Sequence, residues 1–192
     1  MKAQATQTLN GIDRAQMQET VKAIKKQPTL AQFEWRVHNK WLGGGANRST
    51  IRDFYGAGQE DTSRSEDFVF VNGEPPVLLG ANEGANPVEF LLHALAGCIT
   101  STAVIHAAAR GIRIESISTR LEGDMDLRGF LDLDPSITPG YEGIRVVVDI
   151  QADCGDEELD ELLAFAKDHS PVSQSLCRPV PVTVERTRSL SS

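Results

Sequence analysis

Cys98 is the residue whose chemical type and position first suggest a reaction. The chain has three cysteines, Cys98, Cys154 and Cys177, and no CxxC pair. Their odd number and wide spacing fit neither a disulfide framework nor a zinc site. A free cysteine is either an inert thiol packed in the core or a reactive nucleophile, and the residues around it must decide between the two.

The segment around Cys98 predicts one long helix. In Asn86-Pro87-Val88-Glu89, an N-cap is followed by a proline at the first helical position and an acid at the third, which is the pattern of a capping box. The helix is expected to continue to about Arg110, where Gly111 can adopt the left-handed conformation that ends a helix. The helix dipole acts only on the terminal turns, so a thiol in the middle becomes nucleophilic only if tertiary structure brings a cation to it.

The other elements predict an α+β fold. Strands group at both ends of the chain with helices between them, which favours α+β over a doubly wound sheet. Because the central helix is apolar on nearly every face, it must be surrounded by a sheet and by a second subunit. We expect strands within 33–41, 67–80, 112–126, 143–154 and 179–187, helices at 12–26 and 156–168, and a helical turn from 170 to 177.

Three of these expectations rest on local patterns. Strict alternation in 33–41 predicts a strand with one buried face, formed by Phe33, Trp35, Val37 and Trp41. The glycine-rich stretch 43–50 is expected to be a turn, and the Asn-Gly pair at 72–73 predicts a hairpin or two short strands within 67–80.

Composition excludes several classes of function. A formal charge of −8 repels phosphate backbones, so nucleic acid is not an expected partner. The apolar stretch 87–109 contains Glu89, His93 and His106 and is too polar for a membrane span. The N-terminus lacks the apolar core of a secretory signal, which predicts a cytoplasmic protein.

No cofactor or metal site is expected. The four histidines show no metal-ligand pairing, and GGGANRST lacks the Lys-Ser/Thr ending of a phosphate-binding loop.

Three segments resemble one known family. GANPVEFLLHALAGCITSTAV (84–104) is similar to the helix signature of the OsmC/Ohr superfamily, the osmotically inducible and organic-hydroperoxide-resistance proteins. SPVSQSL (170–176) and the stretch 124–150 are also similar to it, in the same order along the chain. The resemblance covers about 33–187, so we divide the chain into an N-terminal helical extension, 1–32, and an OsmC-like domain, 33–192. It implies an intertwined homodimer in which antiparallel sheets surround two central helices, with sites at the subunit interface.

The resemblance also implies a reaction, the thiol-dependent reduction of lipid or alkyl hydroperoxides. In such proteins the helix cysteine attacks the peroxide and becomes a sulfenic acid. An arginine stabilises its thiolate, a glutamate orients the arginine, and a second cysteine resolves the product. Cys98 matches the attacking cysteine. Arg48, which follows the glycine-rich turn, is the best match for the arginine, with Arg36 and Arg52 as alternatives.

The chain departs from the family pattern at two positions. The glutamate that often follows Asn-Pro is Val88 here, and the acid is Glu89, which serves either as the orienting group or only as a helix cap. Ser170 occupies the position of the resolving cysteine. Cys177 lies seven residues further on, about 10 Å along a short helix, beyond the ~7 Å that a disulfide allows; Cys154 is a weaker candidate.

These departures leave two hypotheses. The first is a peroxidase with a one-cysteine cycle, reduced by an external thiol. The second is a non-catalytic dimeric protein of the same fold that serves in a stress response or binds a small ligand.

Overall fold

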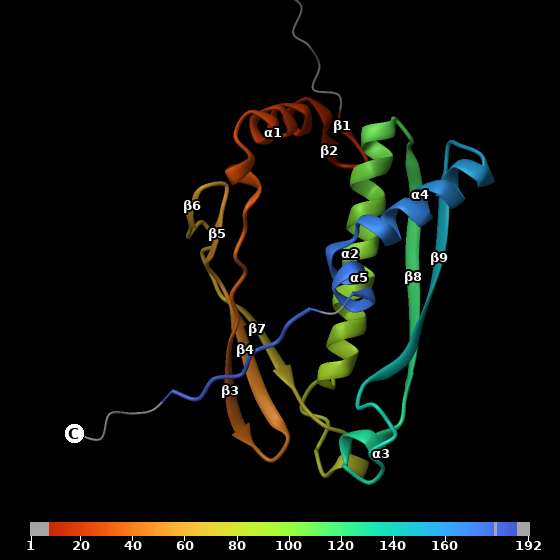
Figure 1. Ribbon diagram of the computed structural model, residues 1–192. Coiled ribbons are helices and arrows are strands. Elements are labelled where there is room, and N and C mark those ends of the chain that lie inside the picture. The colour runs from red at the N-terminus through yellow and green to blue at the C-terminus, as the bar shows by residue number, and fades with distance from the viewer. Residues whose placement is uncertain (1–7, 179, 188–192) are drawn as a thin grey trace, which may run out of the picture.

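The fold is built around one central helix with a sheet on each side (Figure 1). The computed structural model describes residues 8–178 and 180–187. The helices are α1 Arg14–Lys26, α2 Pro87–Arg110, α3 Leu127–Phe130, α4 Asp156–His169 and α5 Pro171–Cys177, with 3-10 turns at Pro28–Ala31 and Pro76–Leu78. The strands are β1 Thr8–Leu9, β2 Ile12–Asp13, β3 His38–Gly43, β4 Ala46–Ile51, β5 Phe54–Gly56, β6 Gln59–Asp61, β7 Phe68–Asn72, β8 Ile114–Met125 and β9 Tyr141–Ala152. This is the α+β class expected from the sequence.

The central helix α2 has the predicted ends. The Asn86 side chain accepts a hydrogen bond from the Val88 N–H (2.9 Å), and the Glu89 carboxylate accepts one from the Asn86 N–H (2.8 Å). Gly111 ends the helix with φ of +87°. The capping box and the glycine stop are therefore confirmed, because both depend only on residues that are close in sequence.

Strands β8 and β9 form a long antiparallel hairpin against α2. The register runs from Ile114 opposite Ala152 to Met125 opposite Tyr141. Where α2 and β8 meet, Ala107, Ile112 and Leu162 form a buried cluster that also involves α4. The core of the domain therefore lies between the C-terminal half of α2, the hairpin and α4.

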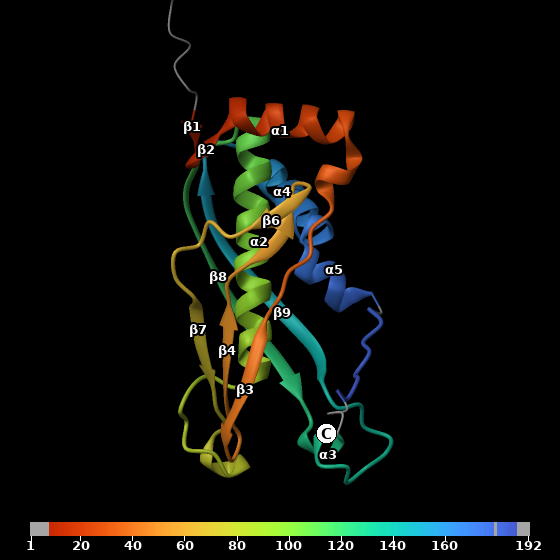
Figure 2. The same ribbon diagram turned by 90° about the vertical axis from the view of Figure 1, so that its left-hand side faces the viewer.

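The second sheet, with strand order β3-β4-β7, lies on the other side of α2 (Figures 1 and 2). One contact between the two is the edge-to-face pair of Phe70 on β7 and Phe90 on α2, whose ring centroids are 6.0 Å apart. Among the described residues only ten apolar side chains are buried, which is few for a domain of this length.

The predicted half-buried strand at 33–41 is wrong for the single chain. The strand begins only at His38, and its expected buried face is open: Phe33, Trp35, Val37 and Trp41 are 48 to 71% exposed. Alternation indicates which side chains are expected to be buried. Burial requires a second surface that packs on them, and the described part of this chain does not provide one.

Three other local predictions also need correction. Only residues 44–45 form the glycine turn, because 46–51 continue as β4. No hairpin forms at Asn72-Gly73, since Asn72 ends β7 and Pro75-Pro76 lead into a 3-10 turn that lacks strand pairing. Residues 180–187, expected within the last strand, pair with no strand among the described residues; Pro179 lies outside them.

The N-terminal segment contacts the end of α2 and the start of β8 through the turn between β1 and β2. The Asn10 side chain donates to the Ile112 carbonyl oxygen and accepts from the Ile114 N–H, both at 2.9 Å. Helix α1, which follows, has no buried residue and crosses the end of α2 (Figures 1 and 2).

Helix α2 alone is long and apolar enough, by length and composition, to cross a membrane, among the residues described. It instead contacts β8, α4 and α5, so we interpret it as the core helix of the fold.

Candidate functional site

Cys98 lies in the middle of α2 and is half-buried. Its backbone carbonyl accepts hydrogen bonds from the hydroxyls of Ser101 (3.2 Å) and Thr102 (2.7 Å). Both hydroxyls therefore bond to the preceding turn of the helix rather than to the sulfur. Within residues 8–178 and 180–187, no hydrogen bond to the Cys98 sulfur occurs.

Two of the three candidate arginines are held by acids of their own neighbourhood. The Arg36 guanidinium donates a hydrogen bond to the Glu34 carboxylate (2.7 Å). It also donates bidentate hydrogen bonds to the Glu60 carboxylate (both 2.9 Å). Arg52 lies 3.2 Å from Asp67. The hydrogen bonds from Arg36 hold the pKa of the Glu60 carboxyl below its usual value.

Arg48 forms no salt bridge within the described part of the chain. It is exposed on β4 and pairs with Val71 of β7, while its neighbour Ser49 pairs with Phe70. Successive residues of a strand point to opposite faces, so Arg48 points away from the face whose Phe70 contacts α2. No hydrogen bond joins Cys98 to any of the three candidate arginines among the described residues.

Glu89 is a helix cap in this structure. Its carboxylate accepts the hydrogen bond from the Asn86 N–H and so completes the capping box. The adjacent first turn is also fixed by Tyr141, whose hydroxyl donates to the Val88 carbonyl (2.9 Å). Burial raises the pKa of Tyr141, and the Glu89 carboxylate adds to this effect.

The position of the resolving cysteine and the two other thiols lie in different environments. Ser170 is fully buried, and its hydroxyl accepts a hydrogen bond from the Ser173 N–H (3.3 Å) as the N-cap of α5. Cys177, the last residue of α5, is exposed. Cys154 packs beside the core cluster, and burial, followed by the charges of Glu158 and Asp153, raises the pKa of its thiol. All three cysteines are free thiols.

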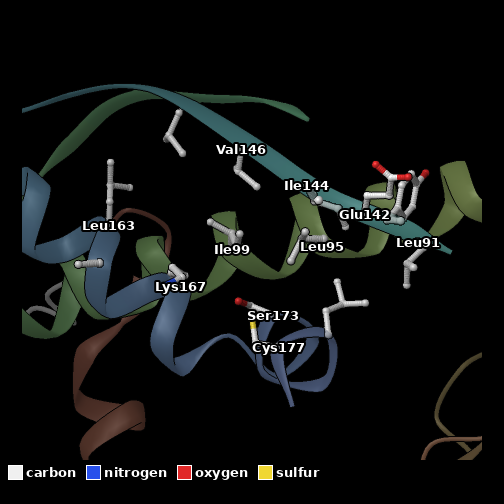
Figure 3. A pocket seen from close by; sticks show the side chains of 15 residues that line it. Leu91, Leu95, Ile99, Glu142, Ile144, Val146, Leu163, Lys167, Ser173 and Cys177 are labelled. Atoms are coloured by element: carbon white, nitrogen blue, oxygen red, sulfur yellow. The ribbon is translucent and has the colours of Figure 1, made fainter. Parts of the chain in front are cut away.

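A cavity of about 670 Å³ opens between α2, β9, α4 and α5 (Figure 3). Its walls are mostly aliphatic, and its polar side chains are Tyr141, Glu142, Lys167, Ser173 and Cys177. Cys98 does not line it, although Leu95 and Ile99 on the same helix do. The remaining lining residues are Leu91, Gly143, Ile144, Val146, Val148, Leu163, Ala164 and Leu176.

Sequence reasoning missed this cavity. The alternation of Ile144, Val146 and Val148 in β9 indicated an apolar face, but a cavity depends on how closely α4 and α5 approach that face. The described residues contain no group of three or more His, Cys, Asp or Glu side chains that could hold a metal ion.

The comparisons with known proteins identify the class. The OsmC-like protein family model matches residues 80–185, more than half of the chain, so this chain belongs to the OsmC-like protein family. No curated protein matches it.

Solved structures agree on the fold. An OsmC-like protein from Mycoplasma pneumoniae has 17% identity and a TM-score of 0.58, covering 75% of this chain and 87% of that one. An organic hydroperoxide resistance protein OsmC from Legionella pneumophila has 19% identity and a TM-score of 0.52, covering 74% and 89%. An OsmC-like protein of unknown function from Vibrio cholerae has 12% identity and a TM-score of 0.52, covering 74% and 92%. At these identities the likeness establishes the fold, which is the OsmC fold.

Proposed function

We propose that this protein is a thiol-dependent peroxidase that reduces lipid or alkyl hydroperoxides through Cys98. The observation that carries the proposal is a half-buried free thiol at the middle of the central helix, within the residues 80–185 that the family model matches. The similarity to a protein named for organic hydroperoxide resistance supports the same activity.

The reaction needs only the thiol and the peroxide in its first step. The Cys98 thiolate attacks one peroxide oxygen, the O–O bond breaks, and the departing alkoxide takes up a proton to become an alcohol. The sulfur is oxidised to a sulfenic acid. One external thiol then forms a mixed disulfide with Cys98 and releases water, and a second external thiol restores the Cys98 thiol and leaves as a disulfide with the first.

We infer that the cation for this thiolate comes from Arg48 of a second copy of the chain. Arg36 and Arg52 are already paired with carboxylates, whereas Arg48 is not, within the described residues. The exposed aromatic face formed by Phe33, Trp35 and Trp41 supports an intertwined homodimer, because a second copy can cover it. In this proposal Glu89 only caps the N-terminus of α2 and does not orient the arginine.

A one-cysteine cycle fits the positions of the other thiols. Ser170 stands where the family has the resolving cysteine, and its hydroxyl caps the N-terminus of α5. Cys177 lies at the far end of α5 from Ser170, and Cys154 packs near the core cluster. The reductant is then an external thiol, as the cytoplasm would supply.

The test is turnover of cumene hydroperoxide with a dithiol reductant. We expect Cys98→Ser to abolish turnover, and Cys154→Ser and Cys177→Ser to retain it. Arg48→Gln should lower kcat/KM about tenfold or more, since an adjacent cation favours the thiolate. Arg120→Gln is the matched control, because Arg120 is an exposed arginine on β8.

Mixed dimers identify the subunit that supplies the arginine. Combining Cys98→Ser subunits with Arg48→Gln subunits should restore roughly a quarter of the wild-type activity, since half of randomly mixed dimers are hybrids with one intact site. If wild-type protein fails to turn over any alkyl hydroperoxide, the peroxidase proposal is wrong. If hybrids stay inactive, Arg48 does not act across the dimer.

The cavity favours a second candidate function, that of a non-catalytic dimeric protein that binds a small ligand. A concave, mainly apolar site with a few polar groups is typical of ligand pockets, and this one lacks Cys98 among its lining residues. Ligand binding without turnover would support this candidate.

A further inference from the structure

We propose that the cavity between α2, β9, α4 and α5 binds an unbranched alkyl carboxylate, with its head group held by Lys167 and Ser173. This inference deepens the ligand-binding candidate above and names the chemistry of the ligand. It does not depend on peroxide turnover, so a failure of either proposal leaves the other standing.

The first observation is an unpartnered hydroxyl. Ser173 lines the cavity although the residue is only 5% exposed. Its backbone N–H donates to Ser170, but its own hydroxyl makes no hydrogen bond to any residue in the described ranges. The hydroxyl opens onto the cavity and is not a buried unsatisfied group. A ligand oxygen in the cavity can therefore accept a hydrogen bond from it.

The second observation is the distribution of charge. Lys167 from α4 lies at the same end of the cavity as Ser173 and Cys177, whereas Glu142 lies at the other end near Leu91 (Figure 3). An anionic head group is attracted to the first end and repelled from the second. Lys167 is 3.7 Å from Asp168, but both side chains are largely exposed and this pair is weak.

The third observation is the wall between the two ends. From Ile99 to Leu91 the cavity follows α2 for about 12 Å. Its lining is aliphatic on α2 and, on β9, at Ile144, Val146 and Val148. Tyr141 offers no donor to a ligand, because its hydroxyl already bonds to the Val88 carbonyl. A long apolar wall with one polar, positively charged end fits an alkyl chain that carries a carboxylate.

The experiment uses Cys177 as a reporter on the cavity wall. The full-length protein is alkylated with N-ethylmaleimide with and without decanoate, and modification of each cysteine is followed by mass spectrometry. At about ten times the dissociation constant, roughly a tenth of the cavities stay empty, so alkylation of Cys177 should slow about tenfold. Cys154, which does not line the cavity, is the internal reference and should react at an unchanged rate.

Calorimetric titration then tests the chemistry of the ligand. Affinity should rise about fourfold for each methylene from hexanoate to decanoate, and decanol and decyltrimethylammonium should bind more weakly than decanoate. Lys167→Met should weaken decanoate binding by about fivefold, the scale of an exposed ion pair, and Ser173→Ala by about tenfold. Lys22→Met, at an exposed lysine on α1, is the matched control and should not change binding.

Three results would overturn the proposal. The absence of decanoate binding to wild-type protein rules out the cavity as a carboxylate site. Equal affinity for decanoate and decanol removes the head-group assignment. Equal slowing of Cys154 and Cys177 would mean that decanoate stabilises the whole protein instead of filling this cavity. All three results are obtained with wild-type protein, so none depends on whether a variant folds.

Discussion

The half-buried sulfur of Cys98 receives no hydrogen bond from its own helix turn. Its neighbours Ser101 and Thr102 bond to the backbone, which leaves the sulfur without a hydrogen-bond donor among the described residues. A thiolate there must be stabilised from outside the helix. In the proposed reaction the stabilising group is far away in sequence, which is the reason for testing Arg48 in mixed dimers.

A second chemically notable residue is His106, at the junction of α2 and α4. Its ring contacts Phe165 edge-on at 4.6 Å and lies 6.3 Å from the His169 ring, while the Arg110 guanidinium stacks over Phe165 at 4.9 Å. Burial lowers the pKa of His106 below its ordinary value of 6.5, and the charges of His169 and Arg110 lower it further.

This lowered pKa predicts a loss of stability in mild acid. Just below pH 6.5 the unfolded chain binds a proton at His106 that the folded protein does not bind, so the free energy of unfolding falls as the pH falls through this window. Replacing His106 by Phe removes the titration and should flatten the pH dependence. Urea unfolding at pH 7.5 and 5.5 measures this change in the free energy of unfolding for the wild type and for His106→Phe. An equally steep loss in His106→Phe would assign the effect to other groups.

At the scale of elements, the start of α2 is the feature on which the position of Cys98 depends. Asn86 and Glu89 each satisfy an N–H that the helix leaves unpaired, and Pro87 needs no such bond. The same turn is held by the Tyr141 hydroxyl from β9. The cap therefore fixes where the helix begins and how it meets the hairpin.

Replacing the cap residues tests this directly. Asn86→Ala should lower the free energy of unfolding by about 1 kcal/mol, measured by urea denaturation. Glu89→Gln keeps an oxygen that can accept from the Asn86 N–H, so it should retain both stability and peroxide turnover. A marked loss of turnover with unchanged stability in Glu89→Gln would instead show that Glu89 orients the catalytic arginine.

At the scale of the whole molecule, the two sheets are covered unequally. The β8-β9 hairpin packs on α2 and α4, whereas the β3-β4-β7 sheet contacts α2 through few residues and leaves aromatic side chains in solvent. Phe33, Trp35 and Phe54 stack on one another. The Arg64 guanidinium lies over the Phe54 ring at 5.1 Å, but Phe33 and Trp35 stay 48 and 64% exposed. A single chain with so much exposed apolar surface predicts association.

Dimer formation has a direct optical test. The two tryptophans, Trp35 and Trp41, are 64% and 71% exposed in the single chain. In an intertwined homodimer they should be covered, so we expect blue-shifted fluorescence and weak quenching by acrylamide. Sedimentation should give about twice 20.9 kDa. A monomer with strongly quenched tryptophan emission would contradict the homodimer.

The sequence by itself determined the features that depend on near neighbours. The cap and stop of α2 and the position of Cys98 within it follow from hydrogen bonds and spacing within a few residues. The family signature in 84–104 lies in these same local patterns, which explains why the family was identified correctly.

The tertiary structure decided the features that depend on distant surfaces. The alternation at 33–41 could not reveal that nothing in the described chain covers Trp35 or Trp41. The strand pairing placed Arg48 on the face opposite Phe70, and the approach of α4 and α5 to β9 created the cavity that holds Ser173 and Cys177. Such contacts join residues far apart in the chain, and local periodicity states only that a face is apolar, not what will pack against it.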